Sequence, residues 1–218
     1  MSYPAYGLPG ATTVDRDRAL LGQVMGLVSL TVAFAAGGAY LGRNLAPGVG
    51  LLCTIAGFVA ILALRFARSS ITLGVAILIG LGTMLGLGIG PVLSRYASLQ
   101  GGSTLIAQAA AGTALFIGAF GAYGYATRRD LSHWARTLFF ALLALIGFGL
   151  IGVFVAIPHA QLIYAIAGLG IFAAYTMFDF NRLKRAQSGD AVFIAASIFL
   201  DVLNVFLLLL SLMSNDRR

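Results

Sequence analysis

Seven long apolar stretches, separated by short polar connections, dominate the pattern of this 218-residue chain. Most approach the roughly 20 residues that a helix needs to cross about 30 Å of hydrocarbon. The second is short and is expected to continue through Arg65. The pattern predicts an all-α, polytopic membrane protein with seven transmembrane helices, over Ala19–Leu41, Val49–Leu64, Ile71–Leu93, Ser103–Thr127, Thr137–Ile157, Ala160–Asn181 and Ala191–Met213.

The same pattern divides the chain into one domain and two tails. Residues 1–18 are predicted to be a flexible cytoplasmic tail, residues 19–214 the transmembrane domain, and residues 215–218 a short polar tail. The first apolar run exceeds the roughly 7–15 residues of a secretory signal core, so it is expected to remain as a helix. Pro91 is expected to bend or end the third span.

Composition supports a membrane protein and argues against several other classes. Hydrophobic residues make up 60% of the chain and charged residues 10%, whereas soluble domains average about 25% charged residues. The net charge is +7, but the basic residues are scattered without interleaved aromatic ones, so nucleic acid is not an expected partner. With one cysteine and two histidines in different connections, we expect neither an enzyme nor a bound cofactor.

The basic residues indicate how the chain is oriented. If the N-terminus is cytoplasmic, ten of the 14 Lys and Arg residues lie on the cytoplasmic side, as the positive-inside rule requires. The basic C-terminal residues Arg217 and Arg218 would then lie outside. A re-entrant last segment is the alternative that would place them inside.

A glycine stripe marks the third span as a packing helix. Gly82, Gly86 and Gly90 recur every four residues, and small residues at this spacing let two membrane helices approach closely. A dinucleotide-binding loop is not indicated, because no strand precedes the glycines. We therefore expect helix packing at these three positions.

Asp179 and Asp201 are the only charged residues inside the predicted spans. A charge at mid-helix costs on the order of 2.5 kcal/mol or more in lipid. The last two spans form a helical hairpin in which the two acids differ in depth by about 6 Å, one helical turn. They are the leading functional candidates, with a purely structural hydrogen-bonded pair as the alternative.

If the two carboxyl groups meet, they can respond to protons. Two carboxylates in a low-dielectric site tend to share a proton, and loss of that proton would make them repel each other. Asp179 and Asp201 would also attract Ca²⁺, but weakly, because Ca²⁺ takes six to eight oxygens. Arg65 and Arg68 could pair with an aspartate and hold the closed form, although Arg65 is as well explained as a positive-inside residue.

The stretches Phe178–Lys184 and Phe199–Leu207 resemble the sixth- and seventh-span motifs of the transmembrane Bax inhibitor motif family. Leu87–Tyr96 and the segments around Gly112 and Arg128 are similar to its bacterial inner-membrane branch. Two features depart from the family pattern. Phenylalanine precedes each aspartate motif where tyrosine is common, and the chain has no glutamate.

The resemblance implies a seven-helix fold with the last helix central, in a bacterial inner membrane. It implies a pH-sensitive Ca²⁺ leak in which Asp179 and Asp201 sense protons and Arg68, rather than Arg65, holds the closed form. Membrane lipid and Ca²⁺ or H⁺ are the expected partners. A second implied function is a non-conducting regulator that binds an FtsH-type membrane protease or another membrane partner, and the oligomeric state stays open.

Overall fold

The computed structural model describes residues 13–67, 70–156 and 158–215, and within these ranges the chain folds into helices without strands. Seven of the described helices are long and apolar enough to cross a membrane, which confirms the predicted fold class. They are α1 (Thr13–Gly42), α2 (Pro47–Ala63), α3 (Ile71–Ala97), α4 (Gly102–Ala126), α5 (Trp134–Phe154), α6 (Ala160–Leu183) and α7 (Ala191–Asn215), with short 3₁₀ turns η1 (Leu64–Ala67) and η2 (Ser188–Asp190).

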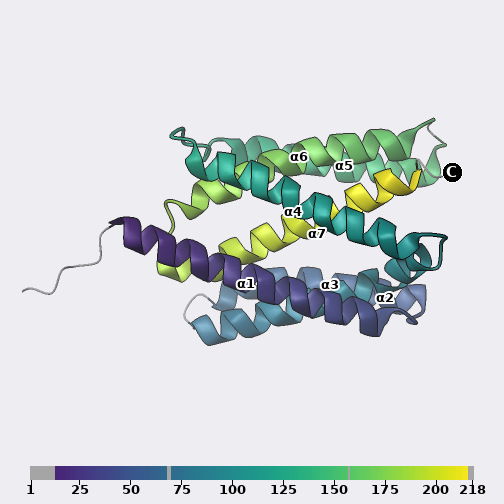
Figure 1. Cartoon of the computed structure of the whole chain (residues 1–218), viewed down its shortest axis with the longest axis horizontal. Helices are drawn as coiled ribbons and strands as arrows, with labels where there is room; N and C mark the ends of the chain where they lie inside the picture. The colour runs from purple at the N-terminus through teal and green to yellow at the C-terminus, as the bar shows by residue number, and fades with distance from the viewer. Residues whose placement is uncertain (1–12, 68–69, 157, 216–218) are drawn as a thin grey trace, which may run out of the picture.

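The helices form two groups of three with α7 between them. Helices α1, α2 and α3 pack together on one side, and α4, α5 and α6 on the other (Figure 1). Helix α7 contacts α1, α3, α4 and α6. Half of its span is buried, against 17% for α2 and 11% for α5. The last helix is therefore central, and α2 and α5 lie at the periphery.

The glycine stripe of α3 lies against α1. A Cβ atom added at Gly86 would lie 2.1 Å from the carbonyl oxygen of Ala35, and one added at Gly82 would lie 2.6 Å from that of Thr31. Gly90 meets the α1 backbone in the same way. The two backbones touch along three successive turns, the close approach that small residues allow in a membrane.

Helix α1 extends beyond the span that hydropathy indicates. It begins at Thr13, six residues before the predicted start at Ala19 and inside the predicted tail. Charged residues can continue a helix past the bilayer, and hydropathy detects only its membrane part. The rest of the predicted tail, residues 1–12, lies outside the described residues, as do residues 216–218.

Pro91 does not end α3, which continues to Ala97. Proline removes one backbone donor and clashes with the preceding turn, but helices in membranes tolerate it where neighbouring backbones pack closely. The Pro91 ring lies beside Gly50 of α2, where a Cβ would be 3.5 Å from it. A Cβ at that distance is in ordinary van der Waals contact, so the ring packs against α2, and the closer neighbour of such a Cβ at Gly50 is the Gly88 carbonyl oxygen, at 3.2 Å.

Helix α7 is one uninterrupted helix of 25 residues. It runs along the bundle, and α7 ends at the end opposite the start of α1 (Figure 1). This arrangement favours a full seventh span over the re-entrant alternative.

Candidate functional site

Both intramembrane aspartates are buried inside the bundle. Asp179 on α6 is 1% exposed and Asp201 on α7 is 3% exposed. Among the described residues, no other charged side chain is buried. Because neither acid faces lipid, the bundle itself must supply their polar partners.

Each aspartate is bonded to a hydroxyl on the opposite helix. The Ser197 hydroxyl on α7 donates to Oδ2 of Asp179, and the Thr176 hydroxyl on α6 lies 3.5 Å from Oδ2 of Asp201. Thr176 and Asp179 are three residues apart, and Ser197 and Asp201 four, so each pair shares one helix face. The α6–α7 interface therefore carries two reciprocal hydroxyl–carboxyl contacts.

The two acids are offset by one helical turn, as the hairpin geometry predicts. Asp179 is level with Ser197, which precedes Asp201 by about 6 Å along α7. No hydrogen bond between described atoms joins the two carboxyl groups directly, but they interact electrostatically. The sequence pattern does not single out either hydroxyl, because the role of each depends on how its helix is rotated.

Two further side chains act on the pair. Arg182, one turn beyond Asp179 on α6, interacts electrostatically with it. Tyr175 interacts with both aspartates. A tyrosine is thus present near the pair although the residues just before the motifs are phenylalanines.

Arg65 and Arg68 are the predicted partners of the aspartates, and the structure describes only Arg65. Arg65 lies exposed in η1 and forms no hydrogen bond or ion pair with a described residue, so it does not hold either aspartate here. A topology role explains it, because a long exposed arginine at a span end is stable in the interface. Arg68 lies outside the described residues.

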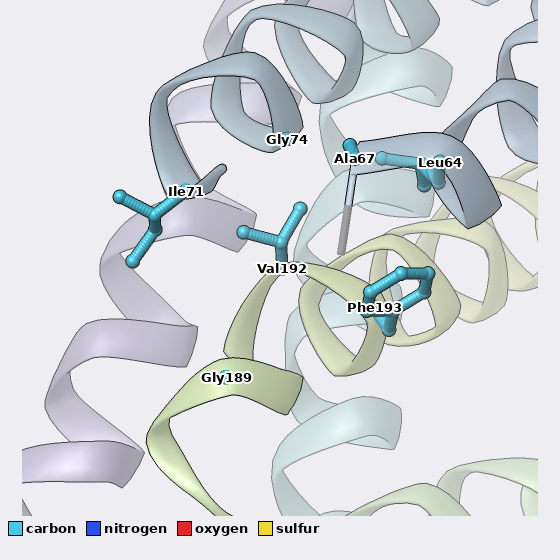
Figure 2. A pocket seen from close by; sticks show the side chains of 7 residues that line it. All are labelled: Leu64, Ala67, Ile71, Gly74, Gly189, Val192 and Phe193. Atoms are coloured by element: carbon cyan, nitrogen blue, oxygen red, sulfur yellow. The ribbon is translucent and has the colours of Figure 1, made fainter. Parts of the chain in front are cut away.

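A small apolar cavity lies beside η1, at the start of α7. Its volume is about 70 Å³. Figure 2 shows Val192 of α7 below Gly74 with Ile71 to one side, and a Cβ added at Gly74 would lie 3.2 Å from Val192. The remaining lining residues are Leu64, Ala67, Gly189 and Phe193. None of these side chains offers a ligand for an ion, so we assign the cavity to packing between α7 and the α2–α3 connection.

Asn181 anchors the end of α6 to the α4–α5 connection. Its side chain is 1% exposed. Its oxygen accepts from the Leu131 N–H at 3.1 Å and from the Arg185 guanidinium, while its nitrogen donates to the carbonyls of Gly124 and Arg129. These four bonds fill the hydrogen-bonding capacity of an amide side chain. The α6 segment that carries Asp179 is therefore fixed to its neighbours.

An exposed ion pair adds to this anchor. Arg185 pairs with Asp130 of the connection. The Arg185 guanidinium, with the Ser132 N–H, holds the pKa of the Asp130 carboxyl well below its usual range. Asp130 therefore remains charged at all ordinary pH values.

The pair supplies few ligands for a metal ion. Within the described residues, no three His, Cys, Asp or Glu side chains gather closely enough to hold a metal. The two carboxyl groups and the hydroxyls of Thr176 and Ser197 are the side-chain oxygens that meet around the pair. Such a small set of oxygens is suited to weak, transient binding of a cation and not to a stable metal site.

This geometry defines a class of protein: an integral membrane protein of seven helices with two acids buried between the last two. The family model described as "Inhibitor of apoptosis-promoting Bax1" matches residues 17–218. The chain therefore belongs to the Bax inhibitor family, as the sequence motifs predict.

Bacterial membrane proteins are among its relatives. An uncharacterized protein of Pasteurella multocida is 32% identical over 79% of this chain and 77% of its own. The inner membrane protein YbhL of Escherichia coli is 25% identical over 78% and 75%. An uncharacterized membrane protein of Vibrio cholerae is 30% identical over 60% of this chain, a match that spans 58% of that relative's length.

Proposed function

We propose that the protein is a pH-sensitive leak channel for cations, Ca²⁺ in particular, whose opening is controlled by protonation of Asp179 and Asp201. The observation that carries this proposal is the burial of both acids, each 3% exposed or less, on facing sides of one helix interface. Membership of the Bax inhibitor family supports it. Intramembrane acids that face a bundle interior are typical of ion and proton pathways.

In the closed form, the pair carries one proton. The Ser197 hydroxyl donates to Asp179, which suits a charged carboxylate there. The Thr176 hydroxyl has one hydrogen and lies closer, at 2.8 Å, to the carbonyl of Phe172. Its contact with Asp201 is therefore best satisfied when Asp201 holds the proton and donates it to the Thr176 oxygen.

Loss of that proton opens the pathway. Two negative charges in a low-dielectric interior repel strongly, and the repulsion acts across the α6–α7 interface. Because Asn181 fixes α6 to the α4–α5 connection, α7 is the helix expected to move. The charged pair attracts a cation, and its incomplete oxygen set releases the ion again.

The same proposal includes a location. Ten of the 14 basic residues lie on the cytoplasmic side if the N-terminus is cytoplasmic, and a relative is named as an inner membrane protein. We place the protein in a bacterial inner membrane with its N-terminus in the cytoplasm.

The test is Ca²⁺ flux into proteoliposomes that contain a Ca²⁺-sensitive dye, measured from acidic to neutral pH. Flux through the wild type should rise with pH, by at most about tenfold per unit, since one proton controls opening. Asp179→Asn and Asp201→Asn should each abolish this dependence. Asp190→Asn is the matched control, because Asp190 lies in η2, outside the spans, and should leave the pH dependence intact.

Unchanged pH dependence in both asparagine variants would end the proposal. Absence of wild-type flux at every pH would favour the second function, a non-conducting regulator that binds an FtsH-type protease or another membrane partner. Co-purification of the intact chain with such a protease tests that alternative directly.

A further inference from the structure

A long apolar groove opens on the side of the bundle between the two helix groups. Its volume is about 870 Å³, and its walls come from α1, α3 and α4. Helix α7, visible between α1 and α4 in Figure 1, forms its floor together with Phe180 of α6. Along α1 the groove runs from Leu21 to Arg43, about 33 Å for a helix. It therefore spans the depth of the membrane.

The α4 wall includes a row of small residues that no helix covers. Ala110, Ala114 and Gly118 line the groove at four-residue intervals and are exposed. A Cβ added at Gly118 would meet nothing within 4 Å, whereas one at Gly124 would lie 2.2 Å from the α6 backbone. Part of the small-residue surface of α4 thus packs α6, and another part faces the open groove.

One end of the groove is basic. Arg43 lines it, and its guanidinium lies 4.1 Å from the centre of the Tyr40 ring. Arg95, at the end of α3, lies at the same face of the bundle. Among the described residues no acidic side chain lies at that face, and the ion pair Arg185–Asp130 belongs to the opposite one.

We propose that this groove binds an anionic phospholipid of the leaflet into which Arg43 projects. An acyl chain lies along Ala110, Ala114 and Gly118, and the phosphate pairs with Arg43. A guanidinium matches phosphate geometry, and no acidic side chain among the described residues pairs with Arg43. Tyr40 holds the guanidinium at the groove end through a cation–π contact.

A flexible lipid suits the groove better than a partner helix does. A helix packed there would bring no counter-charge to Arg43 unless it carried an acid at the same depth. An anionic lipid supplies apolar and charged contacts together.

The lipid would lie against the helices that carry the aspartate pair. Phe180 follows Asp179 and Val202 follows Asp201, and both line the groove. An acyl chain there excludes water from the back of the α6–α7 interface. This inference does not depend on ion conduction, because binding is measured without flux.

Native mass spectrometry of the full chain, with added phosphatidylglycerol or phosphatidylcholine of identical acyl chains, tests the proposal. The wild type should prefer phosphatidylglycerol, and Arg43→Gln should weaken its binding about fivefold, the effect of about 1 kcal/mol per basic residue. Arg43→Lys should retain most of it. Arg95→Gln is the control, since Arg95 lies at the same face but does not line the groove.

A second variant tests the apolar part. Gly118→Phe should fill the groove and reduce binding of both lipids, while Gly147→Phe, at an α5 glycine that also has open space beside it, should not. Equal binding of the two lipids by the wild type, or full binding by both Arg43→Gln and Gly118→Phe, would overturn the proposal. A protein dimer that Gly118→Phe dissociates would identify a second copy as the occupant instead.

Discussion

The α1–α3 and α6–α7 interfaces are built on opposite principles. The first brings two backbones into contact through Gly82, Gly86 and Gly90 and contains no charge. The second contains Asp179 and Asp201, each of which contacts a hydroxyl group on the opposite helix. A backbone contact has one arrangement at which it fits, whereas a buried acid pair has different energies in its two protonation states. We therefore call the α1–α3 contact the fixed interface and the α6–α7 contact, whose energy depends on protonation, the responsive interface.

The largest expected effect comes from breaking the fixed interface. Gly86→Ala would place a Cβ 2.1 Å from the Ala35 carbonyl oxygen, so α1 and α3 must separate. We expect a loss of about 2–3 kcal/mol in the free energy of unfolding, typical of overpacking in a tight core. Thermal or denaturant unfolding in lipid–detergent micelles measures it.

Gly80→Ala is the matched control on the same helix. A Cβ there would meet nothing within 4 Å, and alanine stabilises a helix relative to glycine by up to about 1 kcal/mol. The two substitutions should therefore have opposite signs. If both raised stability equally, the α1–α3 contact would be looser than its backbone distances indicate.

The fixed interface could be predicted from sequence, whereas only part of the responsive one could. A glycine every fourth residue in an apolar span indicates close packing by itself, and an aspartate there is a rare and costly residue. Ser197 and Thr176 carry no such signal, because a hydroxyl is common in membrane helices and its role depends on how each helix is rotated. Asn181 bonds to residues at least 50 positions away in the chain, which no local pattern encodes.

The errors at helix ends have the same kind of cause. Hydropathy locates the bilayer crossing, so the predicted span Ala19–Leu41 matches the apolar part of α1 but not its start at Thr13. The predicted third span ends at Leu93, four residues before the end of α3. The lateral groove was likewise beyond sequence, because it arises from how far apart α1 and α4 lie.

A smaller effect is expected from a change in the responsive interface. Ser197→Ala removes the hydroxyl that donates to Asp179 and leaves a buried carboxylate without that bond. We expect a loss of about 1–2 kcal/mol in unfolding free energy at neutral pH. In the flux assay the midpoint of the pH response should also move to higher pH, because without this donor the shared proton can bind Asp179 as well as Asp201.

Ser211→Ala serves as the control for the serine substitution. Ser211 is on the same helix, and its hydroxyl accepts from Gln161 at an exposed position. It should change neither the flux midpoint nor stability by more than a few tenths of a kcal/mol. A midpoint that stays fixed in Ser197→Ala would show that this serine only packs the interface and does not act on the aspartate pair.

The smallest effect is expected at the exposed end of the responsive region, where Asp130 pairs with Arg185. Arg185 and the Ser132 N–H lower the pKa of Asp130 in the folded protein, so the pair stabilises the fold above the ordinary aspartate pKa of about 3.9 and loses that stabilisation as the pH falls. Asp130→Asn keeps an acceptor for Ser132 but removes the charge. The Asp130→Asn variant should be slightly less stable than the wild type at neutral pH, and the difference should shrink in strong acid and at high salt.

Arg185→Gln is the companion variant, and it also loses a bond to Asn181. It should lower the stability of the fold more than Asp130→Asn does, and a larger part of that loss should persist in acid. A difference between Asp130→Asn and the wild type that did not vary with pH would mean that the carboxyl group acts through packing and not through its charge.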